Sequence, residues 1–325
     1  MRAEKTNRIP YIAAARVIGI LLVVLGHSYP FDVPIPRSLD QMRAFIYTFH
    51  MPLFILISGY LAAKSSRAAG EYIAVRAKKL LIPYLVLSVA AFIPKILVQQ
   101  YLNDSLEFSF AYLLRSEFVP RENVWGHFWY IPVIFFFGVF SALLSKQMKE
   151  RKWVQVVALA GSYMLLWLPE TTDWFALEDM RKTFFYYVLG FLLSCKDEFE
   201  CVVRSKLWLL GLPSALAVFF SETEPKTLVA LLMIGFVFCF GTIADLRQNA
   251  VCKQIEQYSF TIFLLSWPAQ AVMEVVLSRM LQLPVLVSMA GMFMAGIVVP
   301  LLCIQIVNWL EKYVPVRWLK LVLGM

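Results

Sequence analysis

Residues 16–28 have the sequence RVIGILLVVLGHS and form the centre of an apolar block that runs from about Ile9 to Tyr29. A block of this length matches the roughly 20 residues that a helix needs to cross a bilayer. It is longer than the apolar core of a signal peptide, and no small-x-small cleavage site follows it. We therefore predict a retained membrane helix rather than a cleaved leader.

Similar apolar blocks, separated by short polar loops, recur along the whole chain. Ten windows qualify as spans, although the fifth to seventh are short enough to be re-entrant or interfacial. The approximate ranges are 9–29, 44–63, 80–99, 128–145, 153–168, 182–195, 206–220, 227–244, 258–278 and 284–310. We predict an all-α membrane protein, a polytopic bundle of about ten transmembrane helices, in which residues 1–325 form a single integral-membrane domain.

Composition supports this fold class. Of the 325 residues, 60% are hydrophobic and 16% charged, and the mean hydropathy is +0.68. This composition excludes disorder and argues against a soluble fold. The formal charge of +8 does not indicate nucleic-acid binding, because the basic residues form no continuous stripe or arm. Five cysteines with no C-x-x-C pair are predicted to be reduced structural thiols.

Charged residues predict the orientation. If ten spans leave both termini inside, 20 of the 30 Lys and Arg lie on the inner side and 8 on the outer side, with Arg16 and Lys95 within spans. An excess of basic residues on the cytoplasmic side is what the positive-inside rule describes. Both termini are therefore predicted to be cytoplasmic.

This topology places all three histidines, His27, His50 and His127, at the outer membrane face. Glu274, the only acidic residue within a predicted span, lies late in the ninth span on the same side. Each group alone fits an interfacial polar residue, but together they favour an outward-facing reaction or binding site. No metal is predicted, because the His-x-x-x-His and His-Glu-x-x-His spacings are absent.

Arg16 is a cation inside an apolar span, which is costly unless the group is paired or hydrated. It precedes His27 by eleven residues, so both side chains are predicted on one helix face, roughly 16 Å apart along the axis. They would line one side of a common channel, with Arg16 deep and His27 near the outer mouth. The alternative is an arginine that reaches back to the cytoplasmic boundary.

Five blocks from the first to the ninth span form a recognisable set. The first two are Arg16-x10-His27 in the first span and FHMPLFILISGY (49–60) in the second. The later blocks are YIAVRAKKLLIPY (72–84), HFWYIP (127–132) and YSFTIFLLSWP (258–268). Together these blocks resemble the acyltransferase-3 family, integral-membrane O-acyltransferases that modify bacterial surface glycans.

The chain departs from the family pattern at two positions. The second arginine of the family's R-x-x-R pattern is Lys79 here, which retains charge but not bidentate phosphate recognition. Ser266 stands where many members carry a histidine, so no role is transferred to it. No appended esterase-like domain is expected, so the chain resembles the membrane-only members.

The resemblance implies transfer of an acetyl or succinyl group from cytoplasmic acyl-coenzyme A to a hydroxyl of a sugar or cell-surface glycan at the outer face. Arg76, Lys78 and Lys79 are predicted to bind the donor phosphates at a cytoplasmic opening. The alternative is that they belong to the general excess of Lys and Arg in cytoplasmic loops, which needs no ligand. His27 is the expected base, because a neutral imidazole suits proton abstraction near pH 7.

The other candidates are assigned to catalysis or to the acceptor site. His50 is predicted to position substrate or assist the base, or else to serve the start of its helix. His127, Trp129 and Glu274 are candidates for the acceptor site. The alternative for Trp129 is a place in the belt of aromatic residues at the membrane–water interface, which has the same sequence pattern. Residues 106–118 are expected to form an interfacial helix over the site.

The expected partners are the lipid bilayer, acyl-coenzyme A and the glycan acceptor, with glycan-synthesis machinery or a second copy of the chain as further candidates. No permanently bound cofactor is expected, and the location is a multi-pass bacterial cytoplasmic membrane. The rival hypothesis is a polysaccharide exporter, because a polar cavity with a buried arginine also suits a permeation path. Dependence on an acyl donor would distinguish the two.

Overall fold

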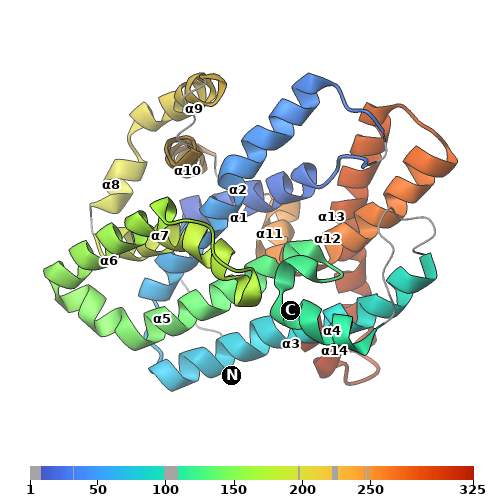
Figure 1. Cartoon of the computed structure of the whole chain (residues 1–325), viewed down its shortest axis with the longest axis horizontal. Coiled ribbons are helices and arrows are strands. Elements are labelled where there is room, and N and C mark those ends of the chain that lie inside the picture. Colours follow the sequence, from blue (N-terminus) through green and yellow to red (C-terminus); the bar gives the residue numbers. More distant parts are fainter. Residues whose placement is uncertain are drawn as a thin grey trace. The chain divides into compact units, whose positions relative to one another are not determined.

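The computed structural model describes residues 9–31, 33–98, 109–196, 198–221, 226–244, 246 and 249–325, without the side chains of 93–98. Every regular element within these ranges is a helix (Figure 1). The all-α prediction is therefore confirmed for the described residues. This description does not include Arg247, the N-terminal basic residues, residues 106–108 of the expected interfacial helix or the side chain of Lys95.

The chain divides into two compact units. Unit 1 comprises residues 1–54 and 197–305, and unit 2 comprises residues 55–196 and 306–325. Two of the three points of division lie within helices, one in α2 (Arg37–Ala63) and one in α13 (Val285–Leu310). The single domain expected over residues 1–325 stays a prediction.

Unit 1 is organised around α1 (Pro10–Gly26), which packs against α10, α11 and α12. Proline at its first position suits a helix start, because the missing amide hydrogen has no partner there in any case. Small residues then allow close packing, since a Cβ on Gly241 would lie 2.9 Å from the Ala14 Cβ. The remaining helices are α8 (Phe199–Val203), η6 (Lys206–Leu210), α9 (Gly211–Phe220), α10 (Lys226–Ile243), α11 (Ala250–Gln257), α12 (Ser259–Glu274) and the π-helical η8 (Val275–Met280).

Unit 2 is built on the packing of α3 (Ala69–Val98) against α5 (Tyr130–Glu150), with α7 (Leu177–Ser194) against α5 and α6 (Lys152–Met164). The C-terminal α14 (Arg317–Val322) packs on α3. The shorter elements are α4 (Phe110–Phe118), η2 (Pro120–Glu122), η3 (Gly126–Trp129), η4 (Leu165–Trp167) and η5 (Trp174–Ala176).

Each of the ten predicted spans contains a helix. Within the described part of the chain, five helical segments are long and apolar enough to cross a membrane by themselves. These five are Arg37–Ala63, Gly126–Glu150, Lys226–Ile243, Ser259–Met280 and Val285–Leu310. Pro10–Gly26 and Lys206–Phe220 are shorter apolar helices. The membrane character is therefore supported, whereas the count of ten and the orientation stay predictions.

Candidate active site

His27 caps the C-terminal end of α1, where the last carbonyls of a helix lack partners within the helix. The His27 amide donates to the Val23 carbonyl at 3.2 Å, and the Ser28 amide donates to the Leu25 carbonyl at 3.0 Å. The Ser28 hydroxyl donates to the Val24 carbonyl at 2.7 Å. The chain leaving α1 is thus held by local hydrogen bonds at the residue that carries the imidazole.

Gln270, a buried residue of α12, strengthens the same helix end. Its amide nitrogen donates to the Val24 carbonyl at 2.7 Å and to the Ser28 hydroxyl at 2.8 Å. Gly296 of α13 allows this arrangement, because a Cβ there would lie 2.7 Å from Val24 and 3.0 Å from the Gln270 amide carbon. The position of His27 therefore depends on three helices of unit 1.

The imidazole of His27 lies between two aromatic side chains. The Tyr47 hydroxyl, from α2, is 3.1 Å from His27 Nδ1 and donates to the Gly26 carbonyl at 3.2 Å. The Trp267 ring, from α12, is centred 4.8 Å from the imidazole. The Tyr47 ring is also centred 5.0 Å from the His50 ring. The structure therefore joins the two predicted histidines through a tyrosine.

His50 is buried, and its Nδ1 donates to the Ile46 carbonyl at 2.8 Å within α2. A backbone carbonyl only accepts hydrogen bonds, so this contact requires a hydrogen on His50 Nδ1. The bond ties the ring to its own helix, which suits the structural role considered for His50 as well as it suits assistance to the base. Its assigned role stays a prediction.

Arg16 is paired. Its guanidinium donates to Glu256 Oε1 at 3.1 Å and to the Ser259 hydroxyl at 2.9 Å, where α11 leads into α12. About a third of the Arg16 side chain is exposed, against a tenth of Glu256. Arg16 contacts Ser259 and His27 contacts Trp267, so both point toward α12 on the face that their spacing predicts.

Glu274 orders the segment that follows His27. Its Oε1 accepts the Phe31 amide hydrogen at 2.7 Å, and the Phe31 ring stacks 6.4 Å from Trp267. The side chain of Glu274 is buried. The structure thus places Glu274 near the C-terminal end of α1, which carries His27, as predicted. There its hydrogen bond to the Phe31 amide holds the segment that follows α1. Acceptor binding by Glu274 stays a prediction.

The predicted donor cations lie in unit 2 and differ from one another. Arg76 inserts between α3 and α5, where it donates to the Tyr72 hydroxyl at 3.0 Å and to the Ile134 carbonyl at 3.1 Å. Gly138 makes room for it, because a Cβ there would lie 2.6 Å from the Arg76 Nε. Lys78 and Lys79 are exposed. The three cations are neighbours on α3 but do not share one environment.

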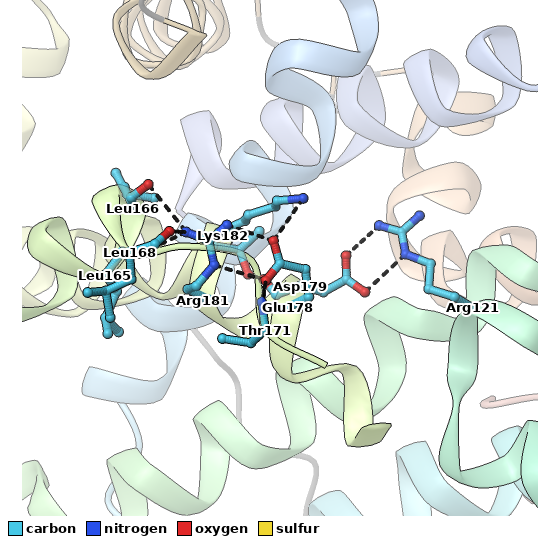
Figure 2. A network of polar contacts seen from close by, with 10 residues as sticks. Arg121, Leu165, Leu166, Leu168, Thr171, Glu178, Asp179, Arg181 and Lys182 are labelled. Carbon is cyan, nitrogen blue, oxygen red and sulfur yellow. Dashed lines mark hydrogen bonds and ion pairs between the residues drawn. The ribbon is translucent and has the colours of Figure 1, made fainter. Parts of the chain in front are cut away.

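His127 and Trp129 lie on η3, also in unit 2. His127 is buried, with its ring centred 4.7 Å from the Phe128 ring. The Trp129 ring carries the Arg121 guanidinium over one face at 4.7 Å, a cation–π contact. Arg121 also forms a two-pronged ion pair with Asp179 of α7 (Figure 2). One face of the Trp129 ring, a candidate for the acceptor site, is therefore covered by the Arg121 guanidinium.

Beside this pair, Glu178 and Arg181 form a second ion pair at the start of α7, in which both partners are buried (Figure 2). Hydrogen bonds, first from Arg181 and then from Thr171 and Lys182, hold the pKa of Glu178 well below its usual range. Burial raises the pKa of Asp179, and Arg121 offsets part of that rise. The network fixes the segment before α7, on the side predicted to face outward.

Sequence reasoning did not assign several residues that lie near His27 and Arg16. These residues are Tyr47, Trp267, Gln270 and Glu256. Trp267 lies inside the quoted late motif, and Tyr47 lies two residues before Phe49, the first residue of the FHMP block, so proximity to these motifs was the available signal. Glu256 is a charged residue just before an apolar span and looks like an ordinary loop residue. Within the described residues, no group of three or more His, Cys, Asp and Glu could hold a metal ion.

Comparison with known proteins gives a family match over nearly the whole chain. A family model described as an acyltransferase domain matches residues 9–309. Nodulation protein NolL of Sinorhizobium fredii (strain NBRC 101917 / NGR234) is 30% identical over 207 residues, which cover 59% of this chain and 51% of NolL. The chain thus spans about half the length of this curated relative. No solved structure matches.

Proposed function

Because the chain belongs to the acyltransferase-3 family, we propose that it is an O-acyltransferase of the cell membrane. In this proposal it moves an acetyl or succinyl group from cytoplasmic acyl-coenzyme A to a hydroxyl of a sugar or surface glycan at the outer face of a bacterial cytoplasmic membrane. The observation that carries the proposal is the position of His27. It occupies a helix end fixed by three helices and shares a face of α1 with a paired arginine.

The proposed chemistry is a direct transfer. The neutral imidazole of His27 takes the proton of the acceptor hydroxyl as its oxygen attacks the thioester carbonyl. The carbon–oxygen bond forms, the carbon–sulfur bond breaks, and the coenzyme A thiolate leaves. The thiolate then takes the proton from the imidazolium, so the products are the O-acyl ester and free coenzyme A.

Arg16 and the cations of unit 2 are proposed to serve the donor. A guanidinium held by Glu256 within an otherwise apolar face of α1 supplies a fixed positive charge along a path toward His27. Arg76, Lys78 and Lys79 remain the proposed contacts of the donor phosphates, and His127, Trp129 and Glu274 those of the acceptor. His50 is proposed to position substrate or to assist the base. Acyl-coenzyme A acts here as a co-substrate, without a resident cofactor. Association with glycan-synthesis machinery or a second copy remains part of this proposal.

His27→Ala is the central test. In a strain lacking the gene, wild-type protein should restore surface glycans heavier by one acetyl or succinyl unit, whereas His27→Ala should lower acylation by at least about 100-fold because the base is lost. Mass spectrometry of the glycans measures the difference. Equal amounts of both proteins in the membrane fraction control for insertion. Full acylation by His27→Ala would remove this residue from the mechanism.

Arg16 provides a second, graded test. Arg16→Lys keeps a positive charge and Arg16→Ala removes it, so transfer should fall more in Arg16→Ala. Equal, full activity of both variants would show that the charge is not used. Glycan movement across vesicles without acyl-coenzyme A consumption would contradict the proposal and indicate an exporter.

A further inference from the structure

The contacts of Tyr47 restrict where the hydrogen of the neutral His27 ring can lie. A tyrosine hydroxyl has a single hydrogen to donate, and a neutral imidazole carries one on either Nδ1 or Nε2. The Tyr47 oxygen lies 3.2 Å from the Gly26 carbonyl oxygen and 3.1 Å from His27 Nδ1. Only one of these two contacts can use the tyrosine hydrogen.

The Gly26 carbonyl decides between the two arrangements. It belongs to the last turn of α1, and Gly26 is buried. If Tyr47 donated to the ring instead, this carbonyl would lose the hydroxyl donor shown in the structure, and a buried carbonyl without a donor is unfavourable. With Tyr47 donating to Gly26, its oxygen can accept a hydrogen from Nδ1, so both contacts are satisfied.

We infer that Tyr47 is a positioning residue that fixes His27 as the Nδ1–H tautomer, with the basic lone pair on Nε2. This inference rests on the proposed function, in which that lone pair receives the proton of the acceptor hydroxyl. When the ring becomes an imidazolium, the Tyr47 oxygen continues to accept from Nδ1–H and stabilises the added charge. The tyrosine keeps its own hydrogen on Gly26 throughout and never exchanges a proton.

A tautomer measurement tests the inference without relying on activity. The chain has only three histidines, so protein labelled with ¹⁵N-histidine in lipid bilayers gives three ring systems. His50→Gln and His127→Gln variants assign them by difference. Wild-type His27 should show a protonated Nδ1 and an unprotonated Nε2, and Tyr47→Phe should shift it toward the other tautomer. His50 should keep Nδ1–H in both proteins, because its partner is the Ile46 carbonyl.

The activity of the same variant gives a second readout. Tyr47→Phe should lower kcat by about 10- to 100-fold with the KM for acyl-coenzyme A unchanged. The imidazole base is retained in this variant, but its lone pair is no longer held on Nε2. Tyr29→Phe is the matched control. Tyr29 is also buried in unit 1, and its hydroxyl has no hydrogen-bond partner among the residues that the structure describes, so its removal should leave kcat unchanged.

The outcomes separate this inference from the proposed function. A protonated Nε2 in wild-type His27, or the same His27 tautomer in Tyr47→Phe as in wild type, would overturn the inference. A tautomer that shifts as expected supports it, even in the case where His27→Ala keeps full activity and the proposed base fails.

Discussion

Glu117, near the C-terminal end of α4, is a carboxyl group in surroundings that disfavour its charge. The Tyr84 hydroxyl of α3 donates to the Glu117 backbone carbonyl at 2.9 Å and holds this end of α4 against α3. Burial raises the pKa of the Glu117 carboxyl to about 7, and the Ser88 hydroxyl offsets part of the rise. A pKa this high means that the folded protein binds the proton more tightly than the unfolded chain does.

This binding gives a pH-dependent stability with a definite sign. Between the ordinary value of 4.5 and about 7, the folded state holds more protons, so stability falls as pH rises through that window. Glu117→Gln removes the cost of ionisation. We expect it to raise the Tm by a few degrees at pH 8 and to leave it almost unchanged at pH 4.5. Thermal unfolding of purified protein in one detergent measures both.

Glu150→Gln is the control, because Glu150 is exposed at the end of α5. It should leave the Tm unchanged at both pH values. A Glu117→Gln effect of the same size at pH 4.5 and pH 8 would show that the gain has another origin than ionisation.

Single residues also show where sequence reasoning succeeds. Arg16 and His27 were identifiable because ionisable groups in an apolar span are costly and therefore stand out. Their partners were not, because Glu256 is 240 residues distant in sequence from Arg16 and lies in a polar stretch where acids are common. Tyr47 was missed for a related reason, since an aromatic residue in a membrane helix carries no unusual signal until its hydroxyl is placed.

Among the elements, the contact between α2 and α7 in unit 2 depends on two glycines. A Cβ on Gly59 would lie 2.0 Å from the Tyr187 carbonyl oxygen, and a Cβ on Gly190 would lie 2.0 Å from the Leu56 carbonyl oxygen. Both clashes are with backbone, so no side-chain movement could relieve them. Small residues that let two backbones approach in this way are characteristic of membrane-helix interfaces.

Gly59→Ala should therefore force the two helices apart. We expect it to destabilise the protein by about 3 kcal/mol, because overpacking against a rigid backbone has no inexpensive relaxation. Gly161→Ala is the matched control, since no atom of the described residues lies within 4 Å of a Cβ at that position of α6. It should be neutral or slightly stabilising. Thermal unfolding of the two variants measures the difference, and equal Tm values would contradict the close approach.

Helix ends were less predictable than helix existence. The predicted second span begins at residue 44, whereas α2 begins at Arg37, because a hydropathy window does not register a polar first turn. Similarly, α3 begins at Ala69 rather than residue 80. An apolar window detects the part of a helix that suits lipid, and the polar turns beyond it depend on capping and packing.

At the scale of the whole molecule, the direction of α12 relative to α1 bears on the topology. Arg16, early in α1, contacts Ser259 at the start of α12, whereas Val24, near the end of α1, contacts Gln270 later in α12. The two helices therefore run in the same direction. The sequence assigned them to the first and ninth spans, and odd-numbered spans must cross a membrane in the same direction.

The predicted orientation can be tested with single cysteines. After replacement of the five natural cysteines, we expect Glu170→Cys and Met280→Cys to react with a membrane-impermeant maleimide in intact spheroplasts, because both residues are exposed in segments assigned outside. Glu150→Cys and Lys312→Cys are equally exposed but assigned inside, so they should react only after permeabilisation. Labelling of Lys312→Cys in intact spheroplasts would show that the C-terminal end lies outside. With ten spans, His27 would then lie on the cytoplasmic side of the membrane rather than on the acceptor side.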